Sequence, residues 1–397
     1  MLSHLARSAR LAPARLLSAC LVPRGRGRTP LPPSGATGWS VTRGAAGPGG
    51  GLVLRRAGTC LVPLSLVLAL GAAPAGAASP APAAERTVTD MAGAAVTIRP
   101  GPTPIADLWF AHNEITVMLG AADRIVVSAE NPRDRPWLFR VAPVLLRAET
   151  GIKPDSASAE DLLARHVGLV FVPSRAKAED LRRTGLPALA AEYMTLPNML
   201  RSLDMTAQAL GTDQAAGTAR LYRQKMDAIT TLLSQRLAHL AENEKPRVLH
   251  IARLEPLQID GTDTLIDAWI QAAGGRNAAT VSGNHRPVTF EQIAAWNPDA
   301  VIVDAGVADI PATSPLRALA AYRNGHWWRS PRGVFAWDRY GAEVLLQLQW
   351  AAQHLHPTLF TDLDIAAATR DFYQTFFHYA LSADETTRIL HALPPPA

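Results

Sequence analysis

The chain has 397 residues, 48% hydrophobic and 18% charged, which is ordinary for a globular protein of two or three domains. The formal charge of +5 comes from the first 77 residues, which hold nine of the 39 basic residues and none of the 34 acidic ones. Residues 78–397 contain the remaining thirty basic residues and all 34 acidic ones, so this part of the chain is mildly acidic. It lacks the positive charge typical of a nucleic-acid-binding protein.

Residues 1–77 have the pattern of a leader with an export signal peptide. Arg55 and Arg56 precede a short apolar run at 61–70, and small residues follow up to Ala77, near which we expect cleavage. The apolar run is too short to span a membrane comfortably. Residues 17–20 resemble a bacterial lipid-attachment box, but arginines interrupt the apolar stretch that should precede it. A cleaved signal and a periplasmic location are therefore preferred to a membrane-anchored lipoprotein.

Both cysteines, Cys20 and Cys60, belong to this leader. The chain that follows it therefore has no thiol for a disulfide, for zinc ligation or for nucleophilic catalysis. Residues 78–84, rich in proline and alanine, are expected to form a flexible linker.

Residues 85–211 are predicted to form an N-terminal α/β lobe, because short apolar strands alternate there with helical segments. A parallel sheet of this kind binds ligands beyond the carboxyl ends of its strands. The expected elements are a hairpin at 87–98, strands at 104–105, 125–127 and 167–172, and helices at 113–120 and from 155 onward.

Residues 212–245 are predicted to form one long helix that bridges two lobes. Apolar side chains recur at steps of three or four from Ala219 to Leu240, which is one face of a helix. Thr212 can cap its start, and Pro246 ends it.

Residues 246–397 are predicted to form a C-terminal α/β lobe that repeats part of the first. Residues 291–303 (EQIAAWNPDAVIV) match 160–172 (EDLLARHVGLVFV) at an offset of 131 in their apolar pattern. We interpret this match as an internal duplication of a helix-to-strand unit. The other expected elements are strands at 246–251 and 333–337 and helices at 264–273, 341–354 and 367–379.

Three motifs carry a resemblance to a known family. They are residues 290–293 with 297–302, residues 334–343 followed by Trp350 and His356, and the closing segment 372–377. Over residues 85–393 the chain resembles the substrate-binding proteins of ABC importers for iron-siderophores, cobalamin and haem. The first lobe departs from the family pattern, with residues 166–168 (HVG) where the family usually has a Pro-Asp pair. The resemblance implies an α/β fold of two Rossmann-like βα lobes bridged by a single long helix, with a ligand cleft between the lobes.

The resemblance also implies the function. We expect a monomeric, non-enzymatic receptor that captures a metal chelate and presents it to an ABC permease and its ATPase at the inner membrane, with no cofactor of its own. Ferric siderophore, and hence iron, is the favoured cargo, and haem, cobalamin and molybdate-like oxyanions are the alternatives. In this family one glutamate on each lobe docks against permease arginines, and the matching residues here are Glu160 and Glu291. A simpler interpretation is that each is an acidic residue in the first turn of a helix, where the helix dipole stabilises its negative charge.

Polar and aromatic clusters that follow the predicted strands are the candidate cleft residues. Arginines offer planar forks for the acidic groups of a chelate, and aromatic rings offer flat walls. A site of three histidines for a bare metal ion is a weaker alternative, and no metal site is predicted. The candidate ligand-binding residues are Trp109, His112, Arg133, Arg135, Trp137, Arg175, Tyr193, Arg253, His285, Arg286, Trp337, Arg339 and Tyr340.

Two rival classes stay open beside the receptor. The chain has no nucleophile-elbow, P-loop, zinc-protease or dinucleotide-binding motif, which disfavours the common enzyme classes. A chelatase-like two-lobe enzyme remains an alternative, because such enzymes share this design. The other alternative is an exported scaffold protein without a small ligand.

Overall fold

The computed structural model describes residues 85–396, which lie within one compact unit of the chain. The predicted signal peptide with its cleavage near Ala77 and the predicted linker at 78–84 lie outside the described residues. Every helix in this part of the chain is too short or too polar to cross a membrane.

The N-terminal lobe is built on a four-stranded parallel sheet with the strand order β4-β3-β5-β6. All four residues of β5 are buried, as expected for a strand covered on both faces. An antiparallel hairpin, β1 and β2, precedes the sheet as predicted. The elements are β1 (Arg86–Thr89), β2 (Ala95–Ile98), β3 (Ile105–Asp107), α1 (Phe110–Met118), β4 (Ile125–Ser128), α2 (Pro136–Val141), α3 (Ala159–Ala164), β5 (Leu169–Val172), α4 (Arg175–Arg183), β6 (Ala188–Ala190) and α5 (Leu196–Leu210).

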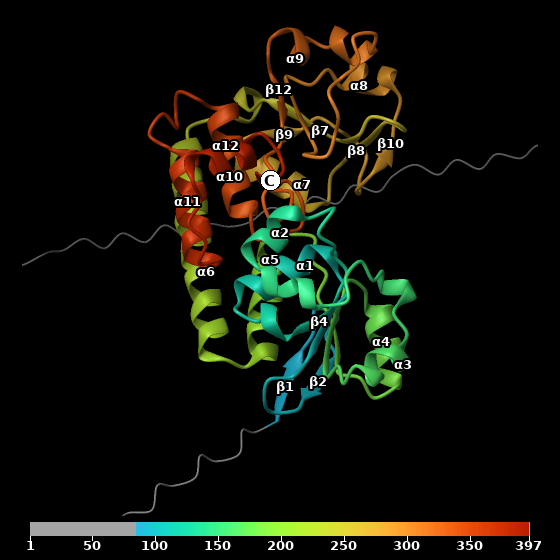
Figure 1. The fold of residues 1–397 in the computed structure, drawn as a ribbon. Coiled ribbons are helices and arrows are strands. Elements are labelled where there is room, and N and C mark those ends of the chain that lie inside the picture. Colours follow the sequence, from blue (N-terminus) through green and yellow to red (C-terminus); the bar gives the residue numbers. More distant parts are fainter. Residues whose placement is uncertain (1–84, 397) are drawn as a thin grey trace, which may run out of the picture. The chain divides into compact units, whose positions relative to one another are not determined.

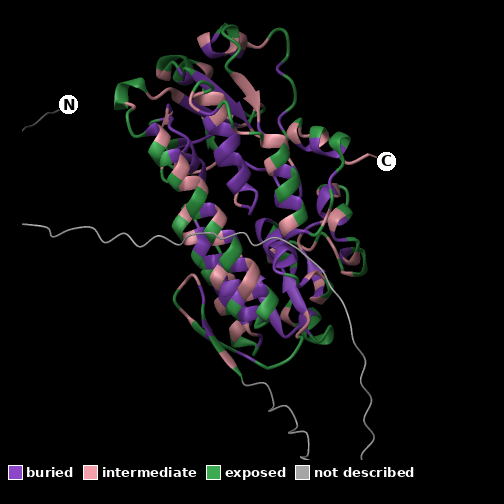
Figure 2. Cartoon of the chain, turned by 90° about the vertical axis from the view of Figure 1, so that its left-hand side faces the viewer, coloured by how far each residue is buried: buried purple, intermediate pink, exposed green. Residues whose placement is uncertain are grey.

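The bridging helix α6 (Asp213–Leu237) follows directly. Gly211 ends α5 in the left-handed conformation, and the Thr212 side chain caps α6 by accepting a hydrogen bond from the backbone N–H of Ala215. The helix packs its buried face against α5 of the first lobe and α7 and α10 of the second, while its other face is exposed (Figures 1 and 2). It is shorter than predicted, because the polar residues after Leu240 form a separate 3-10 turn at Glu242–Glu244.

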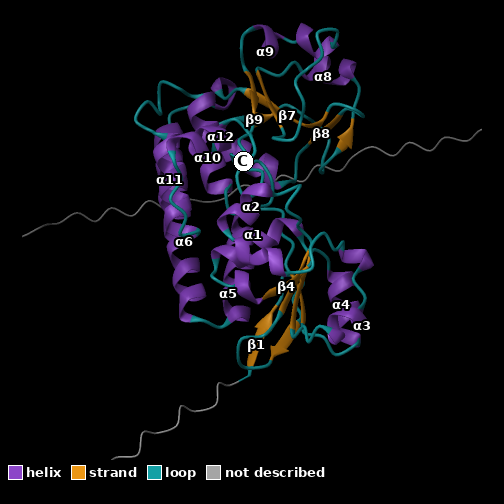
Figure 3. Cartoon of the chain, viewed as in Figure 1, coloured by secondary structure: helices purple, strands orange, loops and turns teal. Residues whose placement is uncertain are grey.

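The C-terminal lobe has a mixed sheet, drawn in orange in the upper part of Figure 3. Its strands β7, β11 and β12 run parallel. The strands β8 and β10 add an antiparallel edge, and β9 pairs with β7. The elements are β7 (Arg247–Arg253), β8 (Gln258–Asp260), α7 (Leu265–Ala272), β9 (Arg276–Asn277), β10 (Arg286–Pro287), α8 (Phe290–Trp296), β11 (Ala300–Val303), α9 (Ala320–Arg323), β12 (Trp327–Arg329), α10 (Val344–Leu355), α11 (Ile365–Phe376) and α12 (Ala383–Leu390).

The predicted duplication is present in the structure. The strands β5 and β11, 131 residues apart, each follow a short capped helix, α3 or α8. Each also lies between the first strand of its sheet and the next parallel strand, in the orders β3-β5-β6 and β7-β11-β12. The two lobes therefore share a common core unit.

The predicted strand at 333–337 is wrong. This segment makes only an isolated bridge, between Arg332 and Ala336. Two of its backbone N–H groups donate to side chains instead of to a neighbouring strand. Phe335 N donates to Glu343 Oε2 at 2.8 Å, and Val334 N donates to Tyr373 Oη at 3.0 Å. A buried carboxylate and a phenol thus replace a neighbouring strand.

The C-terminal helices contact both lobes. The helix predicted at 367–379 is α11, and a further helix, α12, follows it. Beyond α12 the chain reaches the first lobe, where Trp137 Nε1 donates to Leu393 O at 2.9 Å. Arg140 of α2 also donates to the Tyr379 hydroxyl at 3.0 Å. Residues after α10 are therefore part of the junction between the lobes.

The segment 338–342, which we call the junction segment, is held from both sides. Tyr193 and Tyr222 donate their hydroxyls to the carbonyl oxygens of Tyr340 and Ala342, at 2.5 and 2.6 Å. The Glu114 carboxylate accepts from Ala342 N, and a Cβ at position 341 would collide with it. From the second lobe, Trp269 Nε1 donates to Asp338 O at 3.2 Å.

The substitution Tyr222→Phe tests this junction. It removes the Tyr222 hydroxyl and leaves the buried carbonyl of Ala342 without its hydrogen bond. We therefore expect the free energy of unfolding to fall by about 1 to 2 kcal/mol. Urea denaturation measures the change. The control is Tyr322→Phe, at a half-buried tyrosine beside Trp327. An equal loss in both variants would contradict the role of the Tyr222 hydroxyl.

Candidate functional site

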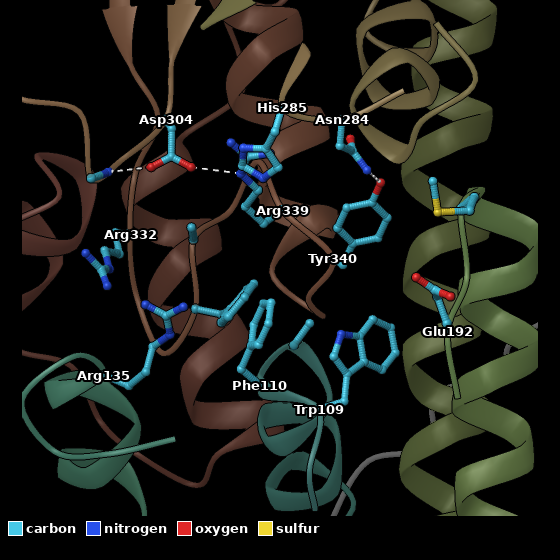
Figure 4. Close-up of a pocket in the computed structure, with 15 residues that line it drawn as sticks. Trp109, Phe110, Arg135, Glu192, Asn284, His285, Asp304, Arg332, Arg339 and Tyr340 are labelled. Carbon is cyan, nitrogen blue, oxygen red and sulfur yellow. Dashed lines mark hydrogen bonds and ion pairs between the residues drawn. The ribbon is translucent and has the colours of Figure 1, made fainter. Parts of the chain in front are cut away.

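A pocket of about 480 Å³ lies between the two lobes (Figure 4). The first lobe contributes the start of α1, the loop before α2 and the segment after β6. The second contributes the loop before β10, the loop after β11 and the segment before α10. The lining residues are Trp109, Phe110, Ala111, Arg135, Glu192, Met194, Asn284, His285, Asp304, Gly306, Arg332, Phe335, Ala336, Arg339 and Tyr340.

Aromatic rings form one wall of this pocket. Phe110 stacks on Phe335 across the lobes with ring centroids 6.0 Å apart, yet half of its surface stays exposed. Trp109 packs edge-on against Tyr193, and Tyr340 lies next to Tyr193 on the other side. Phe110 exposes the most ring surface, whereas Trp109 and Phe335 are almost covered. Rings in a pocket wall are suited to a flat or apolar ligand surface.

Arg339 enters the pocket already neutralised by carboxylates of its own lobe. Its Nη1 is 2.8 Å from Asp260 Oδ2, and its Nε is 2.8 Å from Asp304 Oδ2. Burial acts to lower the pKa of the guanidinium, but the surrounding carboxylates raise it above its usual value. Arg339 is therefore a permanent cation that fixes the position of two acidic side chains.

His250 lies behind Arg339 and is fully buried. Its Nδ1 is 2.8 Å from Asp260 Oδ2, and its Nε2 is 2.7 Å from Asp338 Oδ2. Burial alone would lower the pKa of the imidazole, but hydrogen bonds to the two carboxylates raise it to about 9. The same imidazolium, with Arg339, holds the pKa of Asp260 below its usual range despite burial. His250 is thus a charged member of a buried network.

Five of the predicted residues do line the pocket: Trp109, Arg135, His285, Arg339 and Tyr340. Tyr193 is buried directly behind the aromatic wall. Arg253 lies in an adjoining pocket of about 540 Å³ on the second lobe, which shares His285 and Asp304 with the first.

Three predicted residues belong to the interior and not to the pocket. His112 is fully buried, with its ring nitrogens 2.8 Å from Asp107 Oδ2 and from Thr206 Oγ1. Trp137 is held by the C-terminal segment, and Trp337 Nε1 donates to Glu343 Oε1 at 3.0 Å. The expectation that these side chains contact a ligand therefore needs correction, because each has its polar atoms paired inside the core.

Three predicted arginines face solvent away from the pocket. Arg175 pairs with Glu179 one turn along α4, at 2.6 Å. Arg133 is exposed in the loop before α2, and Arg286 is exposed on the edge strand β10. These arginines also follow predicted strands, so that criterion alone could not distinguish them from the arginines that line the pocket.

The sequence prediction omitted several lining residues. Asp304 follows β11 directly, so the rule that ligands lie at strand ends could have identified it. Phe335 was missed because its segment, 333–337, was expected to be a regular strand, and Arg332 directly precedes that segment. Phe110, Ala111, Glu192 and Asn284 belong to the clusters after the predicted strands but were not among the candidates themselves, and Met194, Gly306 and Ala336 complete the lining.

The histidines do not come together as a metal site. His112 and His250 are engaged with buried carboxylates in different lobes, and only His285 reaches the pocket. Within residues 85–396 no group of three or more His, Cys, Asp and Glu side chains is arranged to hold a metal ion.

The fold is similar to that of periplasmic solute-binding proteins of ABC transporters. A solute-binding protein from Veillonella parvula matches with a TM-score of 0.66 and 22% identity, over 77% of this chain and 97% of that one. The molybdate-bound form of MolA from Haemophilus influenzae matches with a TM-score of 0.65 and 21% identity, over 75% of this chain and 99% of that one.

MolA is also similar to this chain in sequence. The molybdate-binding protein MolA of Haemophilus influenzae is 24% identical over 334 residues, which is 77% of this chain and 94% of MolA. The uncharacterised ABC transporter substrate-binding lipoprotein YvrC of Bacillus subtilis is 22% identical, over 56% of this chain and 69% of YvrC. No family model matches the sequence.

The charge on His250 predicts a pH dependence of stability. Its folded pKa of about 9 lies above the usual 6.5, so its contribution is complete below pH 6.5 and is lost as the pH rises through 9. Glu130 and Glu343, with raised pKa values of about 7, titrate at lower pH. We expect the free energy of unfolding to fall between pH 8 and 9.

Chemical denaturation at several pH values measures this slope. His250→Gln should flatten it, because the titrating group is removed from between Asp260 and Asp338. His326→Gln, at an exposed position, should keep it. A wild-type slope that survives His250→Gln would show that another group is responsible.

Proposed function

We propose that this protein is the exported substrate-binding component of an ABC importer, which captures an anionic metal chelate between its lobes and delivers it to a permease. The single observation that carries the proposal is the interlobe pocket of about 480 Å³, with an aromatic wall from both lobes and three arginines in its lining. That volume lies in the range of pockets for organic ligands. Ferric siderophore is the favoured cargo, because a chelate offers both flat apolar surface and acidic groups.

A molybdate-like oxyanion is the second candidate. The observation in its favour is the similarity to MolA, which extends over 94% of that protein in sequence and is found again in its molybdate-bound structure. An oxyanion would need only the arginine side of the pocket and would leave the aromatic wall unused. The wall is the reason why we place the chelate first.

A binding experiment tests the proposal. The purified protein is titrated with ferric citrate, molybdate, haemin and cyanocobalamin while tryptophan emission is followed, and mass spectrometry identifies any cargo that co-purifies. We expect saturable quenching by one class of ligand, which is recovered unchanged. Trp109→Phe should remove much of the signal, because Trp109 lines the pocket.

The result separates the three classes of protein. A chelatase would change the metal content of an added porphyrin, and a scaffold would neither bind a probe nor retain a cargo. Either outcome would overturn the proposed function.

Docking to the permease is proposed for Glu160 and Glu291. Each side chain is exposed in the first turn of a capped helix, α3 on one lobe and α8 on the other. Both helices lie on the side of their lobe away from α6 (Figure 1). Hydrogen bonds from its own backbone N–H and from Thr289 lower the pKa of the Glu291 carboxyl, so that it stays charged. Two carboxylates, one on each lobe, are suited to an arginine-bearing partner whose binding depends on the distance between the lobes.

The double substitution Glu160→Ala with Glu291→Ala tests the docking. We expect cargo affinity to stay unchanged and cargo uptake by cells to be lost, because the carboxylates lie outside the pocket. The matched control is Glu85→Ala with Glu242→Ala, which removes one exposed glutamate from the first lobe and one from the turn after α6. Normal uptake by the Glu160 and Glu291 variant would refute the docking role.

A further inference from the structure

Two guanidinium groups from different lobes meet at one end of the pocket. Arg135 belongs to the loop before α2, and Arg332 belongs to the segment after β12. Arg332 Nη2 donates to Asp134 O at 2.7 Å, and Arg135 Nη1 donates to the same oxygen at 3.3 Å. Figure 4 shows both side chains on the same side of the pocket, opposite Trp109 and Glu192. A single backbone carbonyl therefore holds two cations close together.

Carboxylates neutralise this pair incompletely. Among residues 85–396, Arg332 is within ion-pair distance of no carboxylate, while Arg135 Nε is 3.0 Å from Glu130 Oε1. Burial, and then the positive charge of Arg135, lowers the pKa of the Arg332 guanidinium. Burial also raises the pKa of Glu130 to about 7, so that its negative charge is only partial at neutral pH. The pair keeps an excess of positive charge.

Arg339 differs from this pair in its surroundings. It touches two carboxylates, Asp260 and Asp304, and its position is set by a network that involves no ligand. Its Nη2 has no partner within residues 85–396, but its charge is already opposed by these two carboxylates, so a third anion would gain less there than at the pair. The sequence alone made Arg339 and Arg135 equal candidates, and the structure separates them.

We propose that Arg135 and Arg332 form an anion subsite, which receives one acidic group of the cargo, a carboxylate or an oxyanion, and links the two lobes through it. This inference rests on the proposed function and specifies which part of the pocket holds the charge. The planar forks of two arginines can each offer paired N–H donors to such a group. Arg135 also lies over the Phe335 ring, 4.6 Å from its centroid, which fixes the plane of its fork.

The position of this subsite orients the cargo. The Phe335 ring lies against Arg135 and stacks on Phe110. Trp109 and Tyr340 lie farther along the pocket (Figure 4). A chelate with one acidic arm would place that arm at the arginine pair and its apolar body along the rings. Because the two arginines come from different lobes, the bound group contacts both lobes at once.

The test compares probes that differ in charge. Affinities of the purified protein for molybdate, for ferric citrate as an anionic chelate and for ferrioxamine B as a cationic chelate are measured by calorimetry. We expect one of the two anions to bind more tightly than the cationic chelate. Arg332→Gln and Arg135→Gln should each weaken that anion by roughly tenfold to a hundredfold, the loss expected for hydrogen bonds to a charged group.

Arg133→Gln is the matched control. Arg133 belongs to the same loop as Arg135 and carries the same charge, but it is exposed outside the pocket, so its substitution should leave the affinity unchanged. Circular dichroism confirms that each variant is folded. If the substitutions weaken the binding of molybdate, the subsite holds an inorganic oxyanion. If they weaken the binding of ferric citrate, it holds the acidic arm of a chelate.

Three results would overturn the anion subsite. Equal anion affinity in wild type, Arg332→Gln and Arg135→Gln would show that the pair does not contact the acidic group. Binding of ferrioxamine B alone would exclude an anionic cargo and leave the receptor function standing. Binding of neither anion at millimolar concentration would also remove the subsite, and the co-purified cargo would then decide the proposed function separately.

Discussion

The two lobes depend on a buried polar junction. The junction segment, residues 338–342, is bonded by two tyrosine hydroxyls and the Glu114 carboxylate on the side of the first lobe and of α6. On the other side, Asp338 and Arg339 are tied to the network of His250, Asp260 and Asp304. Within residues 85–396, Glu114 Oε2, Asp338 Oδ1 and Arg339 Nη2 have no partner, but each of these side chains makes at least one buried hydrogen bond. Such directional bonds define one arrangement more strictly than apolar contacts do. The relative placement of the pocket walls therefore follows from these bonds.

This junction explains why the pocket combines rigid and receptive parts. Residues tied into the network, such as Arg339, have fixed positions and balanced charges. Residues at the other end, such as Arg332 and Phe110, have exposed surface or unbalanced charge. A binding site needs both kinds, because prepared geometry reduces the entropy lost on binding and unused donors supply the affinity.

Local signals predicted much of the fold. The start of α6 was evident from Gly211 and Thr212, because capping depends on neighbouring residues alone. The repeat of β5 and β11 was evident from two buried apolar runs after capped helices. The segment 333–337 was not predictable in this way, because its conformation depends on Glu343 and on Tyr373, almost forty residues away.

The site was predictable only in part, for the same reason. Strand ends located Trp109, Arg135 and His285 near the pocket, because the topology of a parallel sheet places those ends together. The charge state of each arginine depends on contacts over long distances in sequence, such as that between Arg339 and Asp260. No local pattern reveals such a contact, so six arginines looked equivalent when their surroundings differ.

The C-terminal segment has a mechanical consequence. Arg332 N donates to Ile389 O in α12, and a few residues later Leu393 O accepts from Trp137 in the opposite lobe. The chain after α12 thus connects the lobes at a second place, in addition to α6. Any wide separation of the lobes must first break this hydrogen bond, so the C-terminal segment opposes opening together with the stiffness of a helix.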